Sequence, residues 1–228
     1  MKNDELIFCP LGGSGEIGAN MNLYAYGPED NQKWIIVDMG VTFADDTVPG
    51  VDLIYPDPGY ILDKKNDLLG IILTHAHEDH IGAIAHIWPD LKCKIFATPF
   101  TAVLIQEKFK EKKIDISNYL KIVQLNGKVN LGPFEIDFVT LTHSILEPNG
   151  LCITTPAGVI LHTGDWKVDP NPLIGGDIDK NKLIHPGDQG KYKTEMINIQ
   201  NTSLNEFSDF TAKIFNQVIF KLLSSKSR

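Results

Sequence analysis

Residues 71–83 read Ile-Ile-Leu-Thr-His-Ala-His-Glu-Asp-His-Ile-Gly-Ala. The apolar residues at the start predict a short buried strand, and the residues from Ile81 onward predict the beginning of a helix. Between these elements stand four side chains that can bind a metal ion: His75, His77, Asp79 and His80. A polar cluster of this density, directly after an apolar strand, is costly to bury unless a metal ion uses it. The stretch therefore predicts a metal site at the end of a strand.

The spacing within this cluster divides it into two pairs. His75 and His77 are two residues apart, so on an extended backbone they point to the same side and can share one cation. Asp79 and His80 follow the end of the strand, where the chain can turn and direct them to a second cation. Glu78 is out of phase with both pairs, and we expect it in solvent or at the start of the helix. A polar turn whose histidines only make hydrogen bonds is the alternative, and the density of ligands disfavours it.

Two further candidate ligands follow later strands. One predicted strand delivers His143 and another delivers Asp165. Each residue alone would more simply cap a turn. Beside the first cluster, His143 gives the first cation a third imidazole, and Asp165 can bridge both cations. His86 and His162 have no comparable setting, and we expect structural roles for them.

Composition sets broad limits. An apolar fraction of 43% and a charged fraction of 22% are ordinary for a globular protein of 228 residues. The net charge of −8 disfavours a large non-specific hold on nucleic acid, although bound divalent cations would still permit a nucleic acid substrate. The 3 cysteines are far apart and odd in number, so no disulfide framework is implied. Without a signal peptide or a membrane-length apolar run, we expect a cytoplasmic protein that makes no contact with a membrane.

Alternation and turn residues predict the remaining elements. A short helix is expected at 61–66 and an amphipathic helix at 101–113. The predicted strands, the first three of them antiparallel, lie near 6–11, 21–26, 34–38, 93–97, 120–125, 134–141, 151–155 and 158–162.

A dinucleotide-binding fold is a competing interpretation of the amino-terminal region. Gly13, Gly15 and Gly18 fit the spacing G-x-G-x-x-G, and Asp38 follows about twenty residues later. That fingerprint requires a helix after the glycines. Residues 20–26 instead alternate like a strand and end in a Gly-Pro turn. We therefore expect the glycines to let the backbone pass close to the metal site.

These residues together resemble the metallo-β-lactamase fold, whose signature is His-x-His-x-Asp-His, a later histidine and a later aspartate. Within that fold the similarity is to the ribonuclease J family, the β-CASP branch that degrades and matures RNA. The matching segments are Gly12–Asn20, Val51–Asp52, Leu73–Gly82, Thr142–Ile145 and His162–Lys167.

The resemblance implies a mixed α/β (α+β) fold, an αββα sandwich with the site at the edge between its two sheets. It implies up to two zinc ions per chain: one on His75, His77 and His143, the other on Asp79 and His80, with Asp165 as the bridge. Asp79 and His80 would also be catalytic, with Asp79 orienting a hydroxide shared by the ions. Members of the family cleave RNA as exonucleases from the 5′ end and as endonucleases.

The chain also departs from the family pattern. The resemblance covers roughly residues 6–184, whereas the family carries a β-CASP domain and one more zinc-binding histidine that are not found here. We expect a partial metallo-β-lactamase-like domain at 1–190, incomplete on its carboxyl-terminal side, and a divergent tail at 191–228. The tail predicts an amphipathic helix with a stripe formed by Phe207, Phe210, Ile214, Val218 and Leu222. This helix could cover an open sheet edge, form a homodimer, or be unselected sequence.

Three functions follow from this pattern. The first is a zinc-dependent hydrolase that cleaves RNA phosphodiester bonds. The second is a β-lactam hydrolase, because the same hydroxide can attack the carbonyl of a small β-lactam. The third is a non-catalytic remnant that binds metal without turnover. The sequence alone favours the first and leaves the other two open.

Overall fold

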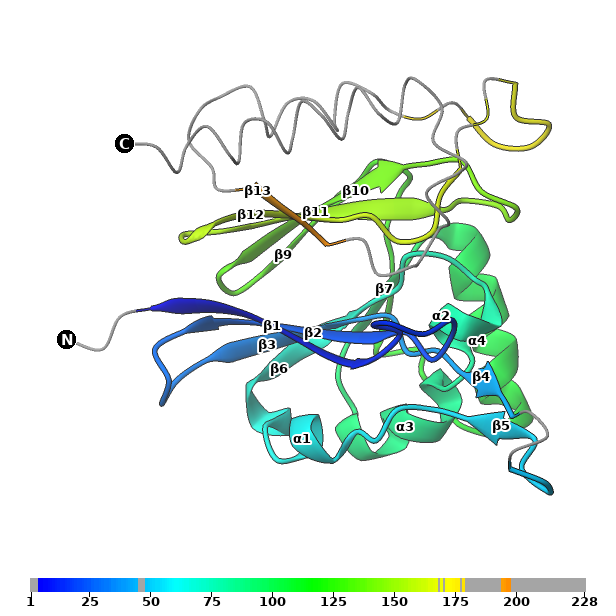
Figure 1. The fold of residues 1–228 in the computed structure, drawn as a ribbon, viewed down its shortest axis with the longest axis horizontal. Coiled ribbons are helices and arrows are strands. Elements are labelled where there is room, and N and C mark those ends of the chain that lie inside the picture. The colour runs from blue at the N-terminus through cyan, green and yellow to red at the C-terminus, as the bar shows by residue number, and fades with distance from the viewer. Residues whose placement is uncertain are drawn as a thin grey trace.

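The computed structural model describes residues 4–44, 48–167, 169, 171–176 and 178, together with the backbone of 194–197. These residues form two β-sheets stacked face to face, with helices along the outer side of the first sheet (Figure 1). The amphipathic helix predicted within 207–222 lies outside the described residues. Within the described part of the chain, no helix is long and apolar enough to cross a membrane.

The first sheet combines antiparallel and parallel strands. Its first three strands are antiparallel, as predicted, and the remaining strands run parallel to the third. The dinucleotide interpretation fails because a strand, not a helix, follows the glycines. In sheet order the strands are β1 (Glu5–Gly12), β2 (Met21–Gly27), β3 (Lys33–Val37), β6 (Leu68–Ile72), β7 (Ile95–Ala97) and β8 (Leu120–Ile122).

The second sheet contains five of the described strands. Four are antiparallel, and β13 joins the edge of the sheet in parallel to β12. Two of these strands were not predicted from the sequence: β9 lies between the turn residues Asn126-Gly127 and Gly132-Pro133, and β13 falls in the expected divergent tail. In sheet order the strands are β13 (Thr194–Ile197), β12 (Gly158–His162), β11 (Asn149–Thr155), β10 (Phe134–Thr140) and β9 (Lys128–Leu131).

Helices cover the outer face of the first sheet. The predicted helix at 61–66 is two short turns, and the predicted helix at 101–113 begins earlier, at Pro99, because proline suits the first turn of a helix. Residues 40–60, where no strand was predicted, contain a two-stranded ribbon, β4 (Thr42–Phe43) and β5 (Leu53–Ile54). The helices are α1 (Gly59–Leu62), the 3-10 turn η1 (Lys65–Asp67), α2 (Glu78–Ile81), α3 (Ile84–Leu91) and α4 (Pro99–Glu111).

Strand alternation separates two apolar layers. On β3, Trp34 and Ile36 face the helices, whereas Ile35 faces the second sheet. On β10, Phe134 and Phe138 pack in that same inter-sheet layer. Burial on both faces explains why the central strands read as nearly continuous apolar runs.

A polar contact crosses the inter-sheet layer. The Tyr24 hydroxyl on β2 lies 2.9 Å from His162 Nδ1 on β12, and both side chains are buried. Burial raises the pKa of Tyr24, so the phenol stays protonated. Burial also lowers the pKa of His162 to about 4, which keeps this imidazole neutral. The structural role expected for His162 agrees with this setting.

Acid should destabilise the protein through His162. In the unfolded chain the pKa of His162 is about 6.5. Between pH 6.5 and 4 the imidazole is therefore protonated in the unfolded state but not in the folded state. Stability from this group is complete above pH 6.5 and lost as pH falls, by about 3 kcal/mol. Urea unfolding of metal-free protein at pH 7.5 and 4.5 should show a smaller acid loss for His162→Gln than for wild type. Equal losses would contradict the assignment.

Candidate metal centre

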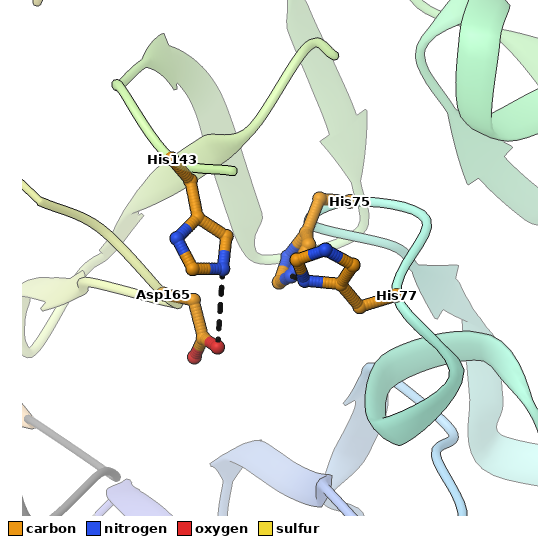
Figure 2. A group of neighbouring side chains, drawn as sticks. All are labelled: His75, His77, His143 and Asp165. Carbon is orange, nitrogen blue, oxygen red and sulfur yellow. Dashed lines mark hydrogen bonds and ion pairs between the residues drawn. The ribbon is translucent and has the colours of Figure 1, made fainter. Parts of the chain in front are cut away.

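The six predicted ligands come together where loops of the two sheets meet. One loop follows β6 and leads into α2, and two others follow β10 and β12. Figure 2 shows four of the side chains converging from these three loops. They form two groups that share one aspartate: His75, His77, His143 and Asp165, and then Asp79, His80 and Asp165.

The first group presents three imidazoles and a carboxylate. One potential ligand atom from each residue lies within 4.8 Å of every other. His75 Nε2 is 3.1 Å from His77 Nδ1, and His143 Nε2 is 3.6 Å from Asp165 Oδ2 (Figure 2). His75 points its other ring nitrogen at the Thr74 hydroxyl, 3.0 Å away, which leaves Nε2 free to face the group.

The three imidazoles of this group are held in the form that binds metals. Burial, followed by the neighbouring imidazoles, lowers the pKa of His75 well below its usual value. Burial is also the main cause that lowers the pKa of His77 and of His143, although nearby carboxylates oppose it. A neutral imidazole offers a lone pair to a cation, so no proton has to leave at neutral pH.

The second group is smaller and more acidic. His80 Nε2 lies 3.3 Å from Asp165 Oδ1 and 3.6 Å from Asp79 Oδ2. Burial acts to lower the pKa of His80, but Asp38 and Asp165 outweigh it and raise the pKa to about 10. In the metal-free protein His80 therefore carries a proton, which a cation bound to Nε2 would replace.

Asp38 holds the two ligand pairs together and was missed as a site residue. Its buried carboxylate accepts hydrogen bonds from the Thr74 backbone N–H and hydroxyl, both 2.8 Å long, and contacts His80 Nδ1 at 2.8 Å. Its φ of 63° lies in the left-handed region, which costs energy for a residue other than glycine. Its place directly after an apolar strand was the available signal.

Two asparagines connect further segments to the ligands. Asn20 Nδ2 donates to the Asp79 carbonyl at 3.1 Å and lies 3.2 Å from His80 Nε2. Asn149, at the start of β11, donates from Nδ2 to the Thr74 carbonyl at 3.1 Å. Neither contact was predicted from the sequence, because each depends on pairing between distant parts of the chain.

The residues present fit divalent metal ions. Imidazole nitrogen and carboxylate oxygen are ligands that zinc prefers in proteins. His80 directs its second nitrogen at a buried carboxylate, an arrangement typical of metal-binding histidines because it fixes the ring and raises its basicity. Asp165 would supply negative charge to both positions.

Gly40 allows the backbone to pass against the second group. The N–H of Met39 donates to the His80 carbonyl at 2.7 Å, and that of Val41 donates to the Glu78 carbonyl at 3.1 Å. A Cβ on Gly40 would lie 1.6 Å from the Asp79 carbonyl oxygen. Any side chain here must therefore push the segment that carries Asp79 and His80 away.

Replacing Gly40 with alanine should damage both stability and the second ligand group. We expect Gly40→Ala to lower the free energy of unfolding by about 3 kcal/mol, because the clash is with backbone and cannot relax by a rotamer change. Gly176→Ala is the matched control, since nothing lies within 4 Å of its Cβ position. Urea unfolding of both variants measures the difference. A Gly40→Ala protein as stable as the control would refute the packing argument.

Metal binding should respond to pH at one position and not at the other. Below pH 10 the proton on His80 competes with the second cation, so affinity there should rise about tenfold per pH unit. The three-histidine position should change little above pH 7, because its imidazoles are already neutral. Stepwise Co²⁺ titrations at pH 6.5, 7.5 and 8.5, followed by visible absorption, test both expectations. Two affinities that rise equally with pH would contradict the charge assignment.

Comparison with known proteins agrees with this geometry. The Metallo-beta-lactamase superfamily profile matches residues 18–201. Ribonuclease J of Sinorhizobium meliloti is 42% identical over 191 residues, covering 83% of this chain and 34% of that protein. Ribonuclease J of Helicobacter pylori is 40% identical over 182 residues, covering 79% of this chain and 26% of that protein. The chain thus spans about a third or less of the length of these relatives.

A solved structure shows the same fold at low sequence identity. A protein of unknown function from Enterococcus faecalis superposes with a TM-score of 0.52 at 15% identity, covering 97% of this chain and 58% of that one. This likeness concerns the fold alone. The predicted sandwich and the predicted resemblance to ribonuclease J are confirmed. The chain belongs to the metallo-β-lactamase superfamily.

Proposed function

We propose that this chain forms a two-zinc centre that hydrolyses the phosphodiester bonds of RNA. The observation that carries the proposal is the place of Asp165 in both ligand groups, which lets two cations share one carboxylate. The choice of RNA is supported by the name ribonuclease J on both relatives. The chain spans only part of those proteins, so RNA cleavage by this chain is part of the proposal.

The six side chains divide the work of holding the ions. His75, His77 and His143 would hold one zinc ion, Asp79 and His80 the other, and Asp165 would bridge them. Two divalent ions so placed lower the pKa of a shared water and stabilise negative charge on the oxygens of the scissile phosphate. The second position has fewer donors, so we expect it to bind its ion more weakly.

Asp79 is the candidate for the proton-handling role. Its side chain is 29% exposed, whereas those of His80 and Asp165 are 3% and 8% exposed. A carboxylate oxygen at the solvent boundary can accept a hydrogen bond from the attacking water and then take up its proton. His80 would bind the same ion through Nε2, while Asp38 fixes the ring through Nδ1.

The mode of cleavage belongs to the same proposal. Exonucleolytic cleavage from the 5′ end and endonucleolytic cleavage are both proposed from the resemblance to the ribonuclease J family, as is a cytoplasmic location. Purified protein should cleave 5′-labelled RNA, and a chelator should abolish the cleavage. A chromogenic cephalosporin in parallel tests β-lactam hydrolysis. Turnover of the cephalosporin but not of RNA would overturn the proposal.

Removing either carboxylate charge should stop catalysis without unfolding the chain. We expect Asp79→Asn and Asp165→Asn to lose the second ion, to retain about one ion, and to cleave RNA about a thousandfold more slowly. The exposed acid Asp63 lies outside both groups, so Asp63→Asn is the control and should keep full activity. Metal analysis and labelled-RNA assays give both quantities. Wild-type protein that carries two ions yet is inert would instead favour the non-catalytic alternative.

A further inference from the structure

Helix α4 contacts two of the three segments that carry the ligands. Near its amino terminus, α4 is hydrogen-bonded to Glu147, which lies four residues after His143. Farther along, Lys108 reaches Glu78, which lies between His77 and Asp79 in the sequence. Neither glutamate belongs to a ligand group.

The contact with Glu147 is a helix cap supplied by another part of the chain. The Phe100 N–H in the first turn of α4 donates to Glu147 Oε2 at 2.8 Å. Thr98, the residue before α4, makes no capping hydrogen bond with its side chain in the described structure. Glu147 therefore caps the helix in its place. A carboxylate at a helix amino terminus is stabilised by the free N–H groups and by the helix dipole.

The backbone carries this anchor toward His143. The Leu141 N–H donates to the Pro148 carbonyl at 2.9 Å and closes the loop that contains both His143 and Glu147. Asn149 then donates from Nδ2 to the Glu147 carbonyl at 2.7 Å. Because the loop is short and closed, a shift of Glu147 also shifts His143.

The contact with Glu78 is an ion pair on both carboxylate oxygens. Lys108 Nζ lies 2.6 Å and 2.7 Å from the two oxygens of Glu78. The Lys108 side chain is 23% exposed, and that of Glu78 is 51% exposed. Glu78 starts α2, as the sequence allowed, so the pair holds the helical turn that carries Asp79 and His80.

A rigid element joins the two contacts. Three side chains of α4, Ala102, Ile105 and Phe109, are buried against the core, and the Phe109 ring packs edge-on against Trp88 at 5.3 Å. The helix therefore cannot follow either loop independently. We propose that α4 is a brace that fixes the spacing between the two ligand groups, with Glu147 and Lys108 as positioning residues.

An ordinary surface ion pair is the alternative, and α4 carries one for comparison. Lys110 contacts Glu107 at 3.1 Å within the same helix, and both side chains are largely exposed. Such a pair contributes little and touches no ligand segment. Lys110→Met is therefore the matched control for Lys108→Met, since each removes one charge from the same helix.

Stepwise Co²⁺ binding to the full chain, followed by visible absorption, tests the brace. Glu147→Ala should weaken the three-histidine position about tenfold, the size of loss seen when residues that orient metal ligands are removed. Glu147→Gln, which keeps an acceptor without the charge, should lose less. Lys108→Met should weaken only the second position, by about threefold, as suits a partly exposed pair. Lys110→Met should bind like wild type.

Hydrogen exchange in metal-free protein supplies a second measurement. The Phe100 amide should exchange faster in Glu147→Ala than in wild type and be unchanged in Lys110→Met. If Glu147→Ala does not fold, Glu147→Gln and Lys108→Met carry the test.

The brace rests on the proposed metal centre, and different results would contradict each of them. Wild-type protein that binds no Co²⁺ would overturn the centre, whereas folded variants with wild-type affinities at both positions would overturn the brace.

Discussion

The centre depends on the contacts that the buried carboxylate of Asp38 makes with Thr74 and His80. This carboxylate binds the backbone and hydroxyl of Thr74 and, with the same side chain, one nitrogen of His80. Thr74 directly precedes His75, the first ligand of the motif, and His80 is its last ligand. One carboxylate therefore sets the geometry of the whole motif. The cost of burying its charge and of its left-handed backbone is offset by these three contacts. An amide in this position could not balance the positive charge on His80 or on a cation beside it.

Charge balance in this buried cluster favours a bound cation. Asp38 and Asp165 are both buried, and His80 between them has a raised pKa of about 10 for that reason. A proton on His80 gives partial balance in the metal-free protein. The three other imidazoles stay neutral because burial lowers their pKa values, so they add lone pairs without adding charge. The cluster thus combines excess negative charge with unprotonated nitrogen, a combination that favours a divalent ion over protons.

The sequence predicted the clustered side chains better than the residues that position them. His75, His77, Asp79 and His80 are close in sequence, so local spacing marks them as candidate ligands, and the structure brings them together. In the sequence, Asp38 fits only a dinucleotide fingerprint, because its contact with Thr74 joins residues 36 apart. Glu147 and Asn149 were likewise missed, since their partners lie on other elements. Among the strands, β9 was missed because turn residues lie on both sides of it, and β13 was missed because it falls in the polar part of the tail.

Because both sheets contribute ligands, the centre is complete only when the sandwich is closed. His75 and His77 follow β6 of the first sheet, and His143 and Asp165 follow β10 and β12 of the second. In an unfolded chain the two sets are far apart, so an ion would bind the folded state much more tightly. Metal binding must then stabilise the packing of one sheet on the other, in addition to serving chemistry. The apolar layer between the sheets and the ligands at its edge are therefore two parts of one cooperative structure.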